Sequence, residues 1–195
     1  MNTKNCKEEL INITTSLINE NGGDVDKVTI RDITSRSGVS VGLINYHFGS
    51  KDNLIAACVQ NIITGIITNF RPNIEVDNNL SPFEAAKVRT IGTACSVFDF
   101  LFENPSISRV SITNDYDNFT SNTNTYLSIR GSASVMGKSY KDEAEREFIA
   151  FTLVSTMQSA FLRALKEPVF MGYDFSKEED RHRYVKDLVN QIMKE

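Results

Sequence analysis

Apolar residues recur at intervals of three and four along most of the chain, which is the spacing of one face of an α-helix. One such stripe runs from Leu10 to Ile18 and ends at Asn21-Gly22-Gly23, a typical helix stop. Two short helices are expected next, one after Thr29 and one after Ser40, with Gly38 between them. No stretch alternates convincingly between apolar and polar residues as a strand would. The pattern therefore predicts an all-α fold with about nine helices.

The later helices are longer and have clearer start signals. Apolar positions predict a buried helix over about 52–70. Ser81-Pro82-Phe83-Glu84 combines a cap, a proline at the first helical position and an acid at the third. A long helix is expected over about 141–166, and Ser176-Lys177-Glu178-Glu179 is interpreted as a capping box opening the last one. The polar stretch 114–125 predicts a loop or a frayed helix.

Composition places the chain among globular proteins. It has 195 residues, of which 41% are apolar and 24% charged, enough for one or two small domains. The most apolar stretch, 54–70, contains too many polar residues for a membrane span, so we expect a buried helix there. The first residues are polar and carry no apolar signal segment, so we expect a cytoplasmic protein with reduced thiols.

Charge and reactive residues narrow the function further. A net charge of −4 excludes nucleic-acid binding by bulk charge, although not a local DNA-reading face. Cys6, Cys58 and Cys95 are too few for a disulfide scaffold, and they form no C-x-x-C pair. The only histidines are His47 and His182. We therefore expect no metal site, no cofactor and no enzyme activity.

Residues 29–51 carry the strongest functional signal. A tight turn at Gly38 separates two short helices and makes the second one project. Ile44 and Phe48 share the inner face of that second helix. Its outer face has no acidic residue and consists of Gly42, Asn45 and Tyr46, with Ser40 and His47 at the margins. A small, polar, uncharged face on a short helix suits insertion into the major groove of DNA.

Each of these residues has a specific expected role. Gly42 allows close approach of the backbone, and Tyr46 and His47 can reach phosphates. Asn45 has the donor and acceptor to pair with an adenine edge. Lys51, at a helix start, can meet a phosphate with its charge and the helix N-terminus.

Simpler roles stay open for the same positions. Ser40 can act only as a helix cap, His47 can pack on its own helix, and Asn45 and Lys51 can be ordinary solvated side chains.

Three segments at fixed spacing resemble the helix-turn-helix of the TetR family of transcriptional regulators. They are Thr29-Ile30-Arg31-Asp32-Ile33, Ser37-Gly38-Val39-Ser40-Val41-Gly42 and Tyr46-His47-Phe48-Gly49-Ser50-Lys51-Asp52-Asn53-Leu54. The resemblance covers about residues 10–55. It implies a DNA-binding domain over 1–52, an effector-binding and dimerisation domain over 53–195, a homodimer, a palindromic operator and a small-molecule effector.

The resemblance also assigns roles by position. Thr29 and Lys51 match phosphate contacts at helix starts. The recognition helix is matched by Ser40, Val41, Gly42, Asn45, Tyr46 and His47. Two positions depart from the family pattern, since Val41 replaces a common Lys, Arg or Pro, and Asn45 a common Tyr. Residues 1–52 contain six basic and seven acidic residues, which predicts a shallow dependence of DNA affinity on salt.

Two further sets of residues are candidates for the second domain. The effector pocket is expected among Cys95, Phe98, Phe102, Tyr116, Tyr126 and Thr152. The dimer interface is expected among Val154, Gln158, Phe161, Tyr184, Leu188 and Ile192. For the aromatic residues Phe98, Phe102, Phe148, Phe151 and Phe161, membership of the core is the favoured role. Cys95 is expected to be an inert thiol.

These observations favour a DNA-binding transcriptional regulator. More specifically, they favour a repressor that a small-molecule effector releases from DNA. We expect the helix that begins near Ser50 to act as the lever between the two domains. Two alternatives remain: a DNA-binding regulator without an effector, and a small helical enzyme, which the scarcity of histidines disfavours. An activator is compatible with the same residues.

Overall fold

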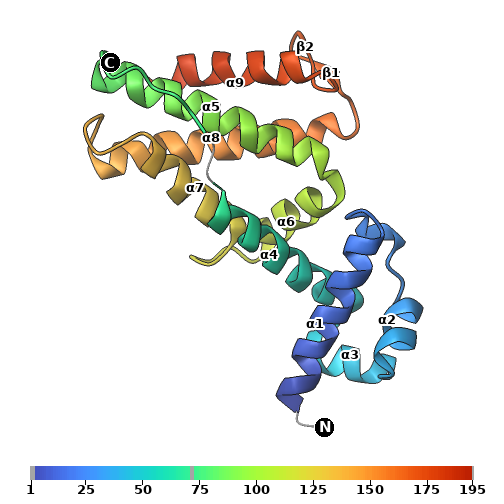
Figure 1. Cartoon of the computed structure of the whole chain (residues 1–195). Coiled ribbons are helices and arrows are strands. Elements are labelled where there is room, and N and C mark those ends of the chain that lie inside the picture. The colour runs from blue at the N-terminus through green and yellow to red at the C-terminus, as the bar shows by residue number, and fades with distance from the viewer. Residues whose placement is uncertain (1–2, 71–72, 195) are drawn as a thin grey trace. The chain divides into compact units, whose positions relative to one another are not determined.

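The computed structural model describes residues 3–70 and 73–194. Nine α-helices and one short hairpin form this part of the chain (Figure 1). The helices are α1 (Thr3–Glu20), α2 (Ile30–Ser37), α3 (Val41–Phe48), α4 (Lys51–Asn69), α5 (Pro82–Glu103), α6 (Pro105–Asp117), α7 (Asn124–Val135), α8 (Glu143–Ala164) and α9 (Glu178–Ile192). A 3₁₀ turn, η1 (Val25–Lys27), precedes α2. The predicted all-α class is confirmed.

The sequence pattern missed one small element, an antiparallel hairpin between α8 and α9. Its strands β1 (Val169–Phe170) and β2 (Tyr173–Asp174) have only two residues each. Met171 (φ 51°) and Gly172 (φ 79°) form the loop, and two successive left-handed residues are what a tight hairpin turn needs. Two-residue strands are too short to show alternation, so periodicity could not predict them.

The chain divides into two compact units. The first contains α1 to α4 together with α6, that is, the described residues up to Asn69 and Ser106–Phe119. The second contains α5, α7, α8, the hairpin and α9, that is, the described residues within Phe70–Pro105 and from Thr120 onward. By its contacts α4 thus belongs with the first three helices. The functional boundary at residue 52 remains a prediction.

Aliphatic side chains fill the core of the first unit. Ile33 of α2 and Ile44 of α3 are both completely buried, and α4 packs against α1 and α3. The other fully enclosed side chains in this unit include Leu10, Ile18, Val28, Leu54 and Cys58. Burial of these positions fixes the short helices, which would be marginal alone.

The core of the second unit is aromatic. Phe98 of α5 is fully buried, with its ring centroid 5.1 Å from Phe102 and 5.8 Å from Tyr184 of α9. Phe102 in turn lies 5.2 Å from Phe161 of α8, and Phe175 completes the cluster. The helices α5, α8 and α9 are therefore joined by edge-to-face and stacked ring pairs.

Three local predictions were wrong, and one was correct only in part. Phe148 and Phe151 were expected in the core, but their side chains are 70% and 55% exposed on α8. The loop predicted over 114–125 is present but spans only 118–123, because α6 continues to Asp117 and α7 starts at Asn124. The expected capping box at 176–179 does not form: Lys177 precedes α9 without a side-chain cap, and the Ser176 hydroxyl donates to Asp174.

No helix in the described part of the chain is long and apolar enough to span a membrane.

Candidate nucleic-acid interface

Helix α2 starts with a complete capping box. The Thr29 hydroxyl accepts a hydrogen bond from the Asp32 N–H (3.2 Å) and donates one to Asp32 Oδ2 (2.6 Å). The Thr29 N–H donates to the same carboxylate oxygen at 3.1 Å. These hydrogen bonds lower the pKa of Asp32. The box fixes the start of α2, and it also occupies the hydroxyl predicted to meet a phosphate.

The turn between α2 and α3 has the geometry that its sequence predicts. Gly38 adopts a left-handed conformation (φ 69°), and its N–H donates to the Thr34 carbonyl at 2.9 Å. Ser40 is the N-cap of α3, and its hydroxyl accepts from the Leu43 N–H at 3.3 Å. The capping role considered for Ser40 is therefore present.

Helix α3 has one buried and one exposed face. Ile44 is fully buried, and Phe48 is half-buried beneath the Lys7 ammonium, 5.4 Å from its ring centre. On the other side Tyr46 is 75% exposed and Val41 46% exposed. Gly42 and Asn45 are exposed as well. The four predicted reading positions are thus available to a large ligand.

His47 is less available than its neighbours. Its ring packs edge-on to Tyr46, with centroids 5.1 Å apart, and to Phe48 at 6.3 Å. The Nε2 atom is enclosed and has no hydrogen-bond partner within the described part of the chain. The packing role considered for His47 is therefore present, and Nε2 would need a ring rotation to meet a phosphate.

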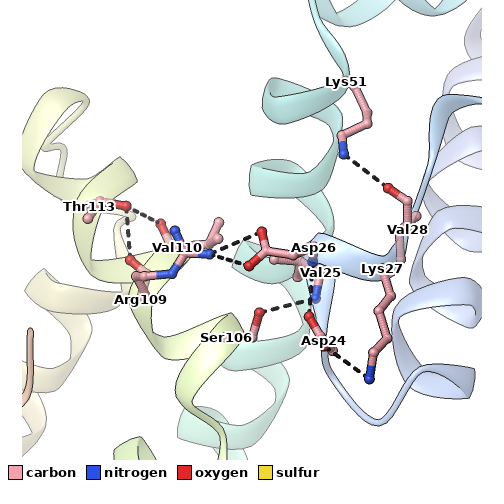
Figure 2. Close-up of polar contacts among 10 residues, drawn as sticks. All are labelled: Asp24, Val25, Asp26, Lys27, Val28, Lys51, Ser106, Arg109, Val110 and Thr113. Atoms are coloured by element: carbon pink, nitrogen blue, oxygen red, sulfur yellow. Dashed lines mark hydrogen bonds and ion pairs between the residues drawn. The ribbon is translucent and has the colours of Figure 1, made fainter. Parts of the chain in front are cut away.

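Lys51, the first residue of α4, points back toward the segment before α2. Its Nζ donates to the Val28 carbonyl oxygen at 3.0 Å (Figure 2). This bond ties the start of α4 to the residue that precedes Thr29. To contact a phosphate, the Lys51 ammonium would have to break this hydrogen bond or donate to the phosphate at the same time.

Helix α6 holds the same segment through two further contacts (Figure 2). The Val25 N–H donates to the Ser106 hydroxyl at 3.1 Å. Arg109 Nη2 contacts both oxygens of Asp26, at 3.2 and 3.0 Å. Sequence reasoning missed these residues, because Asp26 and Arg109 lie 83 positions apart and neither belongs to a motif. Residues 24–28, the junction segment, are therefore held by both α4 and α6.

Most cations of the first unit already have partners. Arg36 bonds Glu20 at 2.5 Å and lowers the pKa of that carboxyl. Lys27 pairs with Asp24 at 3.2 Å, and Arg109 with Asp26. Arg31 has no ion-pair partner among the residues that the structure describes. The unit therefore offers few unpaired charges to a phosphate backbone, in line with its acidic sequence.

The six residues predicted for the effector pocket are divided between the two units, with Tyr116 in the first and the other five in the second. Phe98 and Phe102 lie in the aromatic core of the second unit. Cys95 lies one turn before Asp99 on α5, and burial together with the Asp99 charge raises its pKa to about 11. Thr152 donates its hydroxyl to the Phe148 carbonyl at 2.9 Å. The remaining two are Tyr126 on α7, half-buried, and Tyr116, 66% exposed on α6 in the first unit.

The residues predicted for the dimer interface fall into two groups. The first group is buried in the core of the second unit and consists of Val154, Gln158, Phe161 and Tyr184. The Gln158 amide donates to the Thr125 hydroxyl of α7 at 3.0 Å. Leu188 and Ile192 of α9 are half-buried.

A groove of about 510 Å³ opens on the second unit between α8, the hairpin and α9. It is lined by Ser155, Thr156, Ser159, Ala160, Arg163, Phe170, Met171 and Tyr184. Tyr184 is the only predicted site residue among them. The volume is in the range of small-molecule sites, but most of the lining is polar or at the surface.

Comparison with known proteins agrees with this geometry. Residues 10–58 match the family model described as bacterial regulatory proteins, tetR family. The chain is 38% identical over 71 residues to the HTH-type transcriptional dual regulator CecR of Shigella flexneri, covering 34% of this chain and 32% of that protein. It is 35% identical over 60 residues to the HTH-type transcriptional regulator BetI 2 of Chromohalobacter salexigens, covering 31% of this chain and 28% of that protein. The similarity thus spans about a third of these relatives.

Solved structures show the same fold over nearly the whole chain. A TetR-family transcriptional regulator from Streptomyces coelicolor aligns with a TM-score of 0.55 at 20% identity, covering 98% of this chain and 80% of that one. A TetR transcriptional regulator from Rhodococcus sp. RHA1 aligns with a TM-score of 0.58 at 15% identity, covering 97% of both chains. Residues 10–58 are therefore similar to the helix-turn-helix of the tetR family, and the chain as a whole has the fold of these two TetR-family regulators.

Proposed function

We propose that this chain is a sequence-specific DNA-binding repressor that a small-molecule effector releases from a palindromic operator. The observation that supports DNA reading most directly is the outer face of α3. Gly42, Asn45 and Tyr46 are exposed there, while Ile44 on the opposite face is completely buried. A rigid short helix with an acid-free outer face fits a major groove about 12 Å wide.

In this proposal Asn45 reads an adenine edge and Tyr46 contacts a phosphate. The Thr29 and Lys51 side chains already bond within the protein, so we assign them mainly to positioning α2 and α4. Their helix N-termini still offer backbone N–H groups to phosphates. Few side-chain cations then contribute, and DNA affinity depends only weakly on salt.

Selection of DNA from a random pool tests this reading. We expect the unmodified chain to recover a palindrome, and an Asn45→Ala/Tyr46→Ala variant to lose it. Loss of one bidentate base contact alone costs about 1–3 kcal/mol, roughly 5- to 150-fold in affinity. The matched control is Tyr116→Ala, because Tyr116 is also exposed in the first unit but lies on α6. If the unmodified chain recovers no sequence, the proposal is wrong.

A palindromic operator requires a two-fold dimer, and we assign its interface to the exposed apolar positions of α8 and α9. Phe148 and Phe151 lie three residues apart on α8 and expose most of their rings. Leu188 and Ile192 on α9 are only half-buried. Exposed apolar side chains of this size favour association with another protein surface.

Control by an effector is supported by the contacts of the junction segment. Ser106 and Arg109 of α6 bond Val25 and Asp26, immediately before the cap of α2. A single residue, Asn104, separates α6 from α5 along the chain. An effector that shifts α5 would therefore pull on α6, and α6 on the start of α2. Such an effector lowers operator affinity by the difference between its binding energies for the two states.

A regulator without an effector is the second candidate. It is supported by the packing of Phe98, Phe102 and Phe161, whose rings contact one another edge-to-face in the core of the second unit. A screen of small molecules separates the two candidates. A compound that both raises the melting temperature and weakens binding to the selected operator supports release by an effector; compounds that change neither favour the second candidate.

A further inference from the structure

Three potential metal ligands meet on the second unit. Asp99 lies on α5, and Glu178 and His182 lie one turn apart on α9. These two helices are neighbours and run side by side (Figure 1). One ligand atom from each of the three residues lies within 4.8 Å of the others.

The Asp99 carboxylate is held in a fixed orientation. Its Oδ1 accepts a hydrogen bond from Arg181 Nε at 2.8 Å, and its Oδ2 lies 2.5 Å from His182 Nε2. Arg181 is itself anchored, because Nη1 donates to the Phe175 carbonyl (3.3 Å) and the guanidinium lies 5.1 Å from the Phe102 ring centre. Support of this kind behind a carboxylate is what orients a metal ligand in a protein site.

The two ligands on α9 have the spacing that helical metal sites use. Residues four apart lie on the same face of a helix, so Glu178 and His182 can reach one ion. Glu178 is exposed and His182 partly exposed, so both side chains are free to close on an ion from solvent. The imidazole distinguishes this group from a cluster of carboxylates. One nitrogen with two oxygens suits Zn²⁺ and its first-row neighbours better than Ca²⁺ or Mg²⁺.

We propose that Asp99, Glu178 and His182 bind a divalent transition-metal ion of the Zn²⁺ class, which joins α5 to α9. Two carboxylates balance the charge of the ion, and water completes the tetrahedron. Bond lengths of about 2.0–2.2 Å place tetrahedral donor atoms about 3.4 Å apart. The 2.5 Å contact between Asp99 Oδ2 and His182 Nε2 would therefore open to admit the ion. The positive charge of Arg181 repels the ion, while the negative charges of Glu179 and Asp180 in the same turn of α9 attract it.

The competing role is an ion pair among Asp99, Arg181 and His182 that needs no metal. The sequence alone predicts no metal site, because its two histidines share no motif. Only the packing of α5 on α9 brings Asp99, 83 positions away, to His182.

Titration of the full chain with Zn²⁺, in competition with a chromophoric chelator, separates the two roles. We expect one Zn²⁺ per chain, and at least about tenfold weaker binding in both His182→Gln and Glu178→Gln. His182→Gln keeps a hydrogen-bond donor for Asp99. His47→Ala, which removes the other histidine, and Cys95→Ser are the matched controls and should bind as the unmodified chain does.

Two further measurements make the outcome decisive. Zn²⁺ should raise the melting temperature of the unmodified chain but not that of His182→Gln, whose circular dichroism confirms its fold. Co²⁺ in the site should give visible bands without the intense near-ultraviolet band of a thiolate ligand. Absence of stoichiometric binding, full binding by His182→Gln, or dependence on Cys95 would overturn the proposal.

Discussion

Helices α3 and α8 both expose aromatic rings, but the two surfaces differ in chemistry. Tyr46 of α3 ends in a hydroxyl and lies next to Asn45, whereas Phe148 and Phe151 of α8 carry no polar atom. A tyrosine can contact a hydrated phosphate, while an exposed phenylalanine gains by leaving water. The proposed function accordingly assigns the α3 surface to DNA and the α8 surface to a second copy of the chain.

The two helices also differ in how they are anchored. Helix α3 spans only Val41–Phe48, and Ile44 is its one fully buried side chain. Helix α8 spans Glu143–Ala164 and buries nine residues, among them Leu153, Met157 and Phe161. The position of α3 therefore depends on its caps and on the neighbouring helices. The long helix α8 is held in place by its many buried side chains.

The largest effect is expected from the anchor of α3. Ile44→Ala should lower the free energy of unfolding by about 2–5 kcal/mol, because the cavity it leaves lies in a closed core. Operator binding should be lost with it. Val41→Ala on the same helix is the control and should change stability by no more than about 0.5 kcal/mol. Urea denaturation measures both variants; equal stabilities would show that Ile44 does not anchor the helix.

The exposed rings of α8 should matter for assembly and not for the fold of the monomer. Phe148→Ser/Phe151→Ser should weaken dimerisation by roughly 10⁴-fold or more, because a two-fold dimer loses four rings at about 1.5–2 kcal/mol each. Sedimentation equilibrium measures the effect. Phe119→Ser, another exposed ring but on the first unit, should leave the dimer intact. A dimer that survives the double substitution would place the interface elsewhere.

A smaller effect is expected from the contact between α6 and the junction segment. Arg109 and Asp26 are both substantially exposed, so their coupling should be about 0.2–1 kcal/mol in a double-mutant cycle on operator affinity. Arg109→Ala and Asp26→Ala should weaken binding, and the double variant should be no worse than either. The reversed pair Arg109→Asp/Asp26→Arg should recover part of the loss. Strict additivity would argue against coupling through this pair.

The smallest effect concerns the cap of α2 in acid. Because the pKa of Asp32 is lowered in the folded chain, its carboxylate stabilises the fold above the unfolded value near 3.9. This stabilisation disappears as the pH falls through the folded-state pKa. Urea unfolding between about pH 2 and 6 should show a gap between the unmodified chain and Asp32→Asn that closes in acid. Asp52→Asn, in the exposed first turn of α4, is the control; a gap independent of pH would contradict the assignment.

The local structure on either side of α3 follows from short stretches of the sequence. The box formed by Thr29 and Asp32, the left-handed Gly38 and the Ser40 cap were all predictable, because each involves residues a few positions apart. The same holds for the box of Ser81 with Glu84 at the start of α5. Such interactions form within one turn of the chain, so a short segment contains all that is needed.

Contacts between distant residues depend instead on how the helices pack. Phe148 and Phe151 fit a buried pattern as well as Leu153 does, and packing alone determines which of these faces solvent. The anchoring of Asp26 by Arg109 joins residues with no local relation. The meeting of Asp99 with His182 arises in the same way. Helical periodicity specifies that a face is apolar, but not what covers it, because that depends on how the helices pack.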